Sequence, residues 1–340
     1  MSTSAPTDRV PDLALPITDP ELEQRLLARM AVVEEKLAGY ARSSSSPFVA
    51  EAASHLLEAG GKRFRPLLVL LAAECGPDTL ADEVVTAACV VELTHQASLY
   101  HDDVMDEALL RRGEDTANAR FDNHVAILTG DFLFARSSEL TAELGPEAVR
   151  IQATTFAKLV EGQILEGVEP SEGVDPVGHH LEVLAGKTGV LIATSALYGA
   201  LFAGADKKIQ DALVAYGDIV GVAFQLSDDI LDIASDSDES GKTPGTDLRE
   251  GVPTLPVLLA RRSTEAGDVR LLELLDSDLT DDEALAECVA LLRAHPALAE
   301  ARSYVKARAE EAKAALAPLP EGPVRAALES FADIVAVRSA

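Results

Sequence analysis

The chain has 340 residues, a formal net charge of −28 and a hydrophobic content of 47%. The length allows one large helical domain or two to three smaller ones, and the apolar content is enough for a sizeable core. The acidic balance argues against a protein that wraps DNA or RNA, because neutralising phosphates requires a basic face. Tryptophan is absent and aromatic residues make up 4%, so the core must consist of Ala, Leu, Val and Ile, which suits closely packed helices.

The other global features indicate a cytoplasmic protein. Cys75, Cys89 and Cys288 lie in apolar stretches without paired spacing, so we interpret them as buried residues in a reducing compartment. The chain has no run of 18 uninterrupted apolar residues, so we predict no membrane span. Residues 1–19 have no apolar signal core and are interrupted by proline, which predicts a disordered lead-in before a single domain over residues 20–340.

Helical periodicity dominates from Pro20 onward. Leu22, Leu26, Met30 and Val33 recur at three- and four-residue steps and form one apolar stripe. Further segments are predicted to be helical: 48–59, 66–75, 80–106, 121–142, 146–166, 177–204, 206–234, 252–262, 281–294, 297–317 and 321–337. We find no alternating β-branched run long enough for a sheet. The pattern predicts an all-α bundle of ten or more helices.

The most informative motif is an aspartate pattern that occurs twice. "DDVMD" begins at position 102 and "DDILD" at position 228, each flanked by apolar residues. On a helix the first and last carboxylates of each copy share a face and repel one another unless a hard cation lies between them. Mg²⁺ is such a cation, and it binds a few carboxylates together with phosphate oxygens and water. The alternative is a solvated acidic face. The candidate metal ligands are Asp102, Asp103, Asp106, Asp228, Asp229 and Asp232.

Cations are scarce and clustered. "GGKRFRP" at 60–66 places Lys62, Arg63 and Arg65 at the start of a helix, where a lysine, an arginine fork and backbone N–H groups can hold a diphosphate. Arg111 and Arg112 follow the first aspartate motif. The alternative for either stretch is ordinary loop solvation.

Several polar residues lie beside these motifs. His95 precedes Asp102 by two helical turns, although a lone histidine on a helix is more often structural. "GKTGVL" supplies Lys187 and Thr188 but lacks the glycine spacing of a nucleotide P-loop. Gln225 lies one turn before Asp229, and Lys242 lies in a glycine-rich loop.

Taken in order, these motifs resemble those of the trans-type polyprenyl diphosphate synthases. The resemblance covers residues 20–338 and rests on "GGKRFRP", "HDDVMDEALLRRG", "GDFLFA", "EGQILE", "GKTGVL", "FQLSDDILD" and "GKTPGTDLREG". It implies an all-α fold around a deep central cavity, a homodimer, and two or three Mg²⁺ ions held between the two aspartate-rich helices. The implied reaction adds isopentenyl diphosphate to an allylic diphosphate, head to tail, through an allylic carbocation.

The resemblance also implies roles for individual residues. Asp102, Asp106 and Asp228 are the strongest candidate ligands, whereas Asp103, Asp229 and Asp232 are ligands or support them. Lys62, Arg65, His95 and Arg112 would bind isopentenyl diphosphate. Arg111, Lys187 and Lys242 would bind the allylic diphosphate, and Lys187, Thr188 and Gln225 would stabilise the cation. Many relatives carry a lysine just after the equivalent of Gly251, but this chain has Val252 there.

Product length is expected to depend on Ala97 and Ser98, five and four residues before Asp102. Aromatic residues at these positions close the cavity of short-chain relatives, so small residues predict an open tunnel and a long all-trans product for quinone side chains. The alternative is that both are small only for helix packing. A long product implies transient membrane contact on release.

Four other readings remain open. A geranylgeranyl or farnesyl diphosphate synthase would share every motif and differ in product length. A terpene cyclase would need only one DDxxD, and a regulatory subunit of a heteromeric synthase would not need intact metal motifs. A generic acidic scaffold would require the motifs to have arisen by chance.

Overall fold

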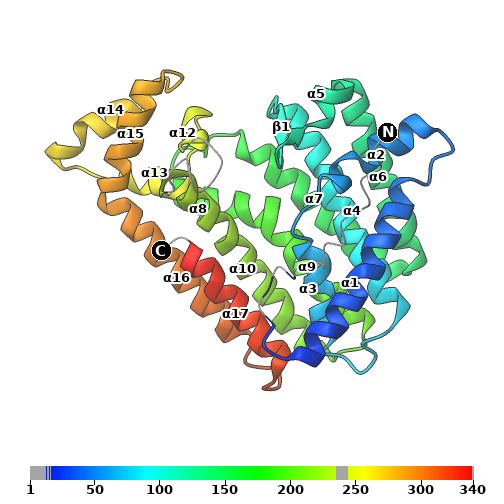
Figure 1. Cartoon of the computed structure of the whole chain (residues 1–340). Helices are drawn as coiled ribbons and strands as arrows, with labels where there is room; N and C mark the ends of the chain where they lie inside the picture. The colour runs from blue at the N-terminus through cyan, green and yellow to red at the C-terminus, as the bar shows by residue number, and fades with distance from the viewer. Residues whose placement is uncertain (1–12, 14, 16, 235–243, 339–340) are drawn as a thin grey trace. The chain divides into compact units, whose positions relative to one another are not determined.

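The computed structural model describes residues 13, 15, 17–234 and 244–338, and these are almost wholly helical (Figure 1). The elements in chain order are α1 (Pro20–Ala41), α2 (Pro47–Glu58), α3 (Phe64–Ala73), α4 (Asp82–Met105), β1 (Leu110–Arg111), β2 (Glu114–Asp115), α5 (Ala117–Phe121), α6 (Asn123–Glu143), α7 (Pro146–Glu166), α8 (Pro176–Leu184), the π-helix η1 (Ala185–Gly189), α9 (Val190–Phe202), α10 (Lys207–Ala234), α12 (Thr246–Arg249), α13 (Leu255–Ala260), the 3₁₀ turn η2 (Ala266–Asp268), α14 (Val269–Leu275), α15 (Asp282–Ala294), α16 (Pro296–Ala315) and α17 (Pro323–Arg338). The predicted all-α fold is confirmed.

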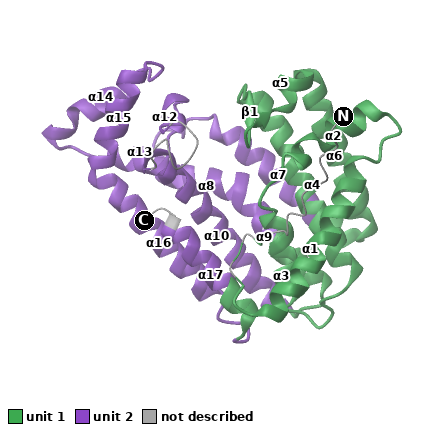
Figure 2. Ribbon diagram, in the orientation of Figure 1, with its two compact units in different colours: residues 1–150, 195–206, 322–327 green, residues 151–194, 207–321, 328–340 purple. Residues whose placement is uncertain are grey.

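The described residues divide into two compact units (Figure 2). Unit 1 comprises residues 1–150, 195–206 and 322–327, and unit 2 comprises 151–194, 207–321 and 328–340. The predicted extent of the domain, 20–340, stays a prediction, and most of the predicted lead-in lies outside the described residues.

Helix starts follow from capping aspartates and prolines. The Asp19 carboxylate accepts a hydrogen bond from the Leu22 amide at 2.8 Å, and Pro20 occupies the first helical position of α1. Asp175 caps α8 in the same way through the Gly178 amide. These caps satisfy N–H groups that have no partner inside the helix. The predicted apolar stripe of α1 is buried, which confirms it as the core-facing side.

In unit 1, α4 is the central helix and packs against α6, α3 and α1. Buried hydrogen bonds hold it in register: the Tyr100 hydroxyl donates to the Ala52 carbonyl at 2.5 Å, and the hydroxyls of Thr94 and Ser137 lie 2.8 Å apart. Hydrogen-bonded polar groups on a buried helix fix its position more sharply than apolar packing alone. The carboxyl end of α4 carries the first aspartate motif.

In unit 2, α10 has the corresponding role and packs against α16, η1 and α13. The buried Tyr216 hydroxyl donates to the Leu328 carbonyl at 2.8 Å, and the rings of Phe224 and Phe331 stack with centroids 6.3 Å apart. Aromatic pairs at this separation contribute beyond the area they bury. The carboxyl end of α10 carries the second aspartate motif.

The segment Pro176–Phe202 is one continuous helical stretch of 27 residues that is long and apolar enough to cross a membrane. Within its most apolar window, 72% of the residues are buried inside the protein. That burial is typical of the core helix of a soluble protein, whose apolar faces are covered by other helices.

Several short elements are absent from the sequence prediction: α5, α12, η2, α14 and the β1–β2 ladder. Residues 269–275, for which the pattern predicts no helix, form α14, where Leu271 and Leu274 are buried. A two-residue antiparallel ladder joins β1 to β2, although the sequence predicts no strand. It is too short to show alternation, and it depends on the positive φ angles of Arg112 (57°) and Gly113 (83°), which suit a tight hairpin.

Close helix contact within unit 1 requires Gly199 on α9. A Cβ at this position would overlap the Val69 carbonyl oxygen and lie 2.9 Å from the Ala72 Cβ. We expect Gly199→Ala to lower stability by about 1–3 kcal/mol, the usual cost of overpacking a core. Thermal unfolding checks this.

The matched control is Gly39→Ala in α1, where no described atom beyond its chain neighbours and the local helix backbone lies within 4 Å of the position that a methyl group would take. Alanine there is expected to leave stability unchanged or raise it by about 0.5 kcal/mol through helix propensity. Equal melting temperatures for Gly199→Ala and Gly39→Ala would contradict the close contact of Gly199 with Val69 and Ala72.

Candidate active site

The first cationic stretch is a strained loop between α2 and α3. Gly60 and Gly61 have φ angles of 87° and 140°, and Arg63 is left-handed at 47°. Positive φ is costly for a residue with a side chain, so Arg63 must be held by its contacts. Lys62 is exposed, and Arg65 is half-buried with an Nε that has no hydrogen-bond partner among the described residues.

The β1–β2 hairpin brings a second pair of arginines to this loop. Arg112 lies at the hairpin turn, and its Nη1 donates to the Gly60 carbonyl and, at 3.5 Å, to the Leu56 carbonyl. A Cβ on Gly61 would lie 2.8 Å from the same Nη1, so the glycine lets the guanidinium lie close to the loop backbone. The two cationic stretches, which are far apart in sequence, therefore meet within unit 1.

His95 lies on α4 beside these arginines and is half-buried. Burial, followed by repulsion from Arg65 and Arg112, lowers the pKa of His95 well below its ordinary value. The ring is therefore neutral near pH 7 and has one N–H donor and one acceptor nitrogen. Three of the four predicted isopentenyl diphosphate residues thus form one cluster, and Lys62 lies on the same loop.

The first aspartate set lies at the carboxyl end of α4, which ends at Met105. The Asp106 amide still donates to the Asp102 carbonyl at 2.8 Å, so the predicted helical spacing extends to the third aspartate. Asp102 is half-buried and Asp106 is exposed. The carboxyl end of a helix is its negative end, which makes carboxylates unfavourable there unless a cation balances them.

Asp103 differs from its two neighbours because it is fully buried. The Arg111 Nε donates to Asp103 Oδ1 at 2.6 Å, while Asp103 Oδ2 has no hydrogen-bond partner among the described residues. Burial raises the pKa of Asp103 despite the opposing effect of Arg111. Arg111, predicted to bind the allylic diphosphate, thus also holds a carboxylate of the motif.

The second aspartate set lies near the carboxyl end of α10, in unit 2. Asp228 is half-buried, whereas Asp229 is buried with its Oδ2 3.2 Å from Nε2 of the buried His180 on α8. Asp232 accepts hydrogen bonds from the amides of Thr246 and Asp247 at 3.2 and 3.1 Å. Its carboxylate therefore anchors the chain that follows residue 243. Lys242 lies outside the described residues.

A metal ion fits this donor chemistry. Two sets of carboxylates lie at negative helix ends, and one buried carboxylate oxygen, Asp103 Oδ2, lacks a donor among the residues described. Within the described part of the chain, no three His, Cys, Asp or Glu side chains already converge as a metal site. That is compatible with Mg²⁺, which takes many of its ligands from phosphate oxygens and water.

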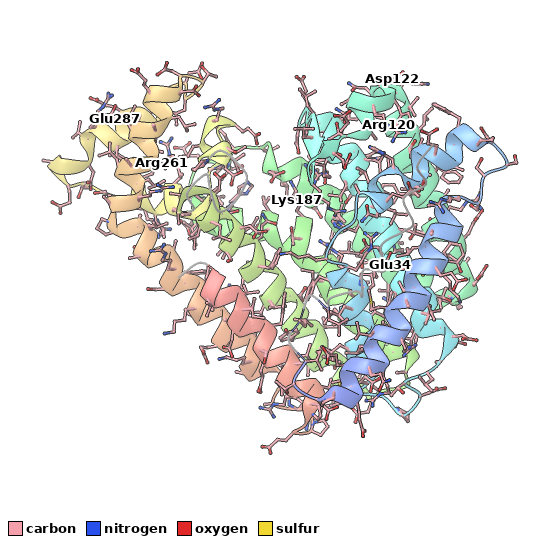
Figure 3. The ribbon with its side chains drawn as sticks, in the orientation of Figure 1. Glu34, Arg120, Asp122, Lys187, Arg261 and Glu287 are labelled. Carbon is pink, nitrogen blue, oxygen red and sulfur yellow. The ribbon has the colours of Figure 1, made fainter. Side chains whose placement is uncertain are left out.

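Lys187 and Thr188 lie in the π-helix η1 of unit 2, where α7 approaches closely. A Cβ on Gly162 would overlap the Lys187 amide nitrogen. The Lys187 side chain (Figure 3) ends with its Nζ 2.6 Å from Glu166 Oε2. The Thr188 hydroxyl lies 3.4 Å from the Gln225 Oε1, so the structure brings these two predicted residues together. Short π-helical turns often occur at functional sites.

Ala97 and Ser98 have different environments on α4. Ala97 is fully buried, and its carbonyl lies 3.1 Å from the position that a Cβ on Gly130 of α6 would occupy. Ser98 is half-buried, and its hydroxyl donates to the His95 carbonyl at 2.8 Å. Ser98 is one turn before Asp102, which places both on the same face of the helix.

Sequence reasoning missed three contributors: the buried Glu92 that pairs with Arg63, Glu166 beside Lys187, and His180 beside Asp229. Glu166 ends the quoted stretch "EGQILE", which could have drawn attention to it. Glu92 and His180 carry no local pattern, because their partners are distant in sequence.

Three comparisons identify relatives of this chain. Residues 46–292 match the family model described as polyprenyl synthetase. The nonaprenyl diphosphate synthase of Mycobacterium tuberculosis is 50% identical over 284 residues, 84% of this chain and 85% of that protein. The heptaprenyl diphosphate synthase component 2 of Geobacillus stearothermophilus is 45% identical over 232 residues, 68% of this chain and 72% of that protein.

Among solved structures, geranylgeranyl pyrophosphate synthase from Corynebacterium glutamicum, complexed with calcium and isoprenyl diphosphate, superposes with a TM-score of 0.86. It is 45% identical, and the match covers 95% of this chain and 99% of that one. The order of the motifs, the helical fold and these similarities agree, and the chain belongs to the polyprenyl synthetase family of prenyltransferases.

Proposed function

We propose that this enzyme condenses isopentenyl diphosphate with an allylic diphosphate, head to tail, and gives a long all-trans polyprenyl diphosphate. The observation that carries the proposal is the combination, in unit 1, of a cationic cluster with carboxylates at the negative end of α4. An anionic diphosphate requires the cationic cluster for binding, and a divalent cation requires the carboxylates. Relatives named as nonaprenyl and heptaprenyl diphosphate synthases support the substrate class and the long product.

The cationic cluster is the proposed isopentenyl diphosphate pocket. Arg65 and Arg112 supply guanidinium donors, Lys62 supplies an exposed ammonium group, and His95 supplies a neutral N–H. Guanidinium groups bind phosphate oxygens in pairs and cannot lose their charge near pH 7. The pocket thereby keeps a high positive charge in a strongly acidic protein.

The remaining polar groups are assigned to the allylic substrate. Asp102, Asp106 and Asp228 would hold Mg²⁺, with Asp103, Asp229 and Asp232 as further ligands or supports. When bound, Mg²⁺ would neutralise the diphosphate and make it a better leaving group. Arg111, Lys187 and Lys242 would hold the same diphosphate.

Departure of the diphosphate leaves an allylic cation, which the dipoles of this chain stabilise. The Lys187 carbonyl, the Thr188 hydroxyl and the Gln225 amide oxygen supply these dipoles, and the 3.4 Å contact between the two side chains keeps them together. The double bond of isopentenyl diphosphate then forms the new carbon–carbon bond, and the departing diphosphate takes the released proton.

A geranylgeranyl or farnesyl product is the second candidate, and the 45% identity to a geranylgeranyl pyrophosphate synthase favours it. The small residues Ala97 and Ser98 favour the longer product instead, because neither closes a tunnel.

We also propose a homodimer in the cytoplasm, with transient membrane contact for product release. Two large apolar residues on α6, Ile127 and Leu128, are exposed on the single chain, and such a surface favours an interaction that covers it. The component 2 relative favours a heteromeric assembly as the alternative.

The metal assignment is tested with the variants Asp102→Asn and Asp228→Asn. Each should lower turnover of isopentenyl and farnesyl diphosphates about 10³-fold or more, because ionisation loses several kcal/mol of charge stabilisation. Product chromatography with and without Mg²⁺ measures this. Asp211→Asn, an exposed aspartate on α10, is the control and should keep wild-type turnover. Near-wild-type activity of either motif variant would contradict the assignment, as would full wild-type activity without Mg²⁺.

The lowered pKa of His95 predicts a stability change with pH. Between that pKa and about 6.5, the unfolded chain binds a proton that the folded protein does not, so stability falls as the pH decreases through this window. His95→Gln removes this contribution. Its melting temperature should therefore drop less than that of the wild type when the pH is lowered from about 7.5 to about 5.5. His124→Gln, at an exposed site on α6, is the control, and identical pH slopes for wild type and His95→Gln would refute the prediction.

Product length is tested with Ser98→Phe and Ala97→Phe. A phenylalanine at either position should shift the product toward farnesyl or geranylgeranyl diphosphate and leave the first condensation largely intact, because the diphosphate sites are unchanged. Ala97→Phe should also lower stability by about 1–3 kcal/mol, since that residue is fully buried. Chromatography of dephosphorylated products and thermal unfolding decide between these effects. An unchanged long product in both variants would show that this helix does not limit length.

A further inference from the structure

Arg63 lies among the predicted diphosphate ligands in sequence, but its guanidinium is fully engaged within the protein. Nε donates at 2.6 Å to Oε1 of Glu34, which lies on α1 (Figure 3), and Nη2 donates to the Leu57 carbonyl at 2.8 Å. Nη1 donates to Glu92 Oε1 at 3.2 Å and to the Gly60 carbonyl at 3.3 Å. These bonds explain how a non-glycine residue is held at positive φ, and they leave Arg63 a structural role.

Glu92 is the buried partner in this network, with 2% of its surface exposed. Its Oε1 also accepts a hydrogen bond from Gln96 Nε2 at 2.7 Å, one turn along α4. A buried carboxylate is costly unless it is paired and hydrogen-bonded, and Glu92 is both. Its carboxylate therefore lies within the group of arginines, 3.2 Å from Arg63 Nη1.

Glu92 is also linked to Arg112, because Arg63 Nη1 donates both to Glu92 Oε1 and to the Gly60 carbonyl, and Arg112 Nη1 donates to the same carbonyl. Burial lowers the pKa values of both Arg65 and Arg112, and Glu92 opposes this by raising them. Glu34 makes the shorter bond to Arg63. Its side chain is 42% exposed, so solvent screens its charge.

We propose that Glu92 is a resident counter-ion of the cationic pocket: it stabilises the clustered arginines when no diphosphate is bound and thereby limits the affinity for diphosphate. The inference rests on the proposed function, in which Arg65 and Arg112 bind isopentenyl diphosphate. A fixed negative charge offsets the repulsion among cations in the empty pocket and opposes the entry of a second anion. Glu92 therefore lowers diphosphate affinity while it raises the stability of the empty pocket.

The test uses Glu92→Gln, which removes the charge and keeps the shape and an acceptor oxygen. Isothermal titration with inorganic pyrophosphate, without metal, should show about tenfold tighter binding than the wild type, as expected for loss of one nearby like charge. The melting temperature without ligand should fall. A merely structural role would lower stability and also weaken binding, so unchanged or weaker pyrophosphate affinity would overturn the proposal.

Two further variants complete the test. Glu34→Gln breaks the other ion pair of Arg63 and should leave pyrophosphate affinity within about twofold of wild type, because that charge is screened. A tenfold gain there would show that any lost partner of Arg63 has this effect, and would overturn the role of Glu92. Glu92→Asp withdraws the carboxylate by one methylene and should bind about threefold tighter. If Glu92→Gln does not fold, Glu92→Asp replaces it in the titration, and unchanged or weaker pyrophosphate binding by Glu92→Asp would then overturn the proposal.

Different results would contradict the proposed diphosphate pocket and the proposed counter-ion role of Glu92. If wild-type protein binds neither pyrophosphate nor isopentenyl diphosphate, and Arg112→Ala changes nothing, the proposed pocket is wrong. If the wild type binds and Arg112→Ala weakens binding, but Glu92→Gln binds no more tightly, only the counter-ion role is wrong.

Discussion

The cationic cluster of unit 1 depends on acceptors that point inward at its centre, above all the Gly60 carbonyl. This oxygen accepts from both Arg63 and Arg112, which come from different loops. Arginines gathered so closely repel one another, and main-chain dipoles together with the buried Glu92 offset that repulsion. The positive φ angles of the loop aim the carbonyl at the guanidinium groups. The positive φ angles, which Gly60 and Gly61 adopt freely and Arg63 adopts at a cost, therefore let this acidic chain gather its arginines.

The aspartate motifs concentrate negative charge instead of positive charge, because both lie at the negative ends of helices. The structure stabilises one or two members of each set with its own groups: Arg111 holds Asp103, His180 contacts Asp229, and two backbone amides hold Asp232. The half-buried Asp102 and the exposed Asp106 contrast with the buried Asp103. Within a motif of identical residues, burial thus distinguishes Asp103, which Arg111 holds, from the more accessible Asp102 and Asp106.

Most of the fold could be predicted because apolar periodicity, prolines and capping residues act locally. The stripe of α1 and the extents of α6, α7 and α10 follow from such patterns. The β1–β2 hairpin and α14 could not be predicted, because two-residue ladders and seven-residue helices depend on tertiary contacts rather than on periodicity.

The residue types of the candidate site could also be predicted, but the different contacts of neighbouring residues could not. Lys62, Arg63 and Arg65 are equivalent cations in the sequence, and only the left-handed turn shows that Arg63 faces Glu34 and Glu92 while Lys62 faces solvent. Those partners lie 29 residues away on either side, so no local pattern reveals them.

The sequence alone also could not distinguish the environments of the two residues expected to govern product length. Ala97 and Ser98 are adjacent in sequence and similarly small, but successive helical residues point about 100° apart. Ala97 and His101 are one turn apart and both lie against Gly130 of α6, so this side of α4 is occupied by α6. Ser98 shares its face with Asp102 instead. We therefore expect a bulky residue at 98 to act on the growing chain from beside the carboxylates proposed to bind metal, whereas one at 97 would first have to displace packed atoms. Small residues at both positions fit the proposed long product, but for different physical reasons.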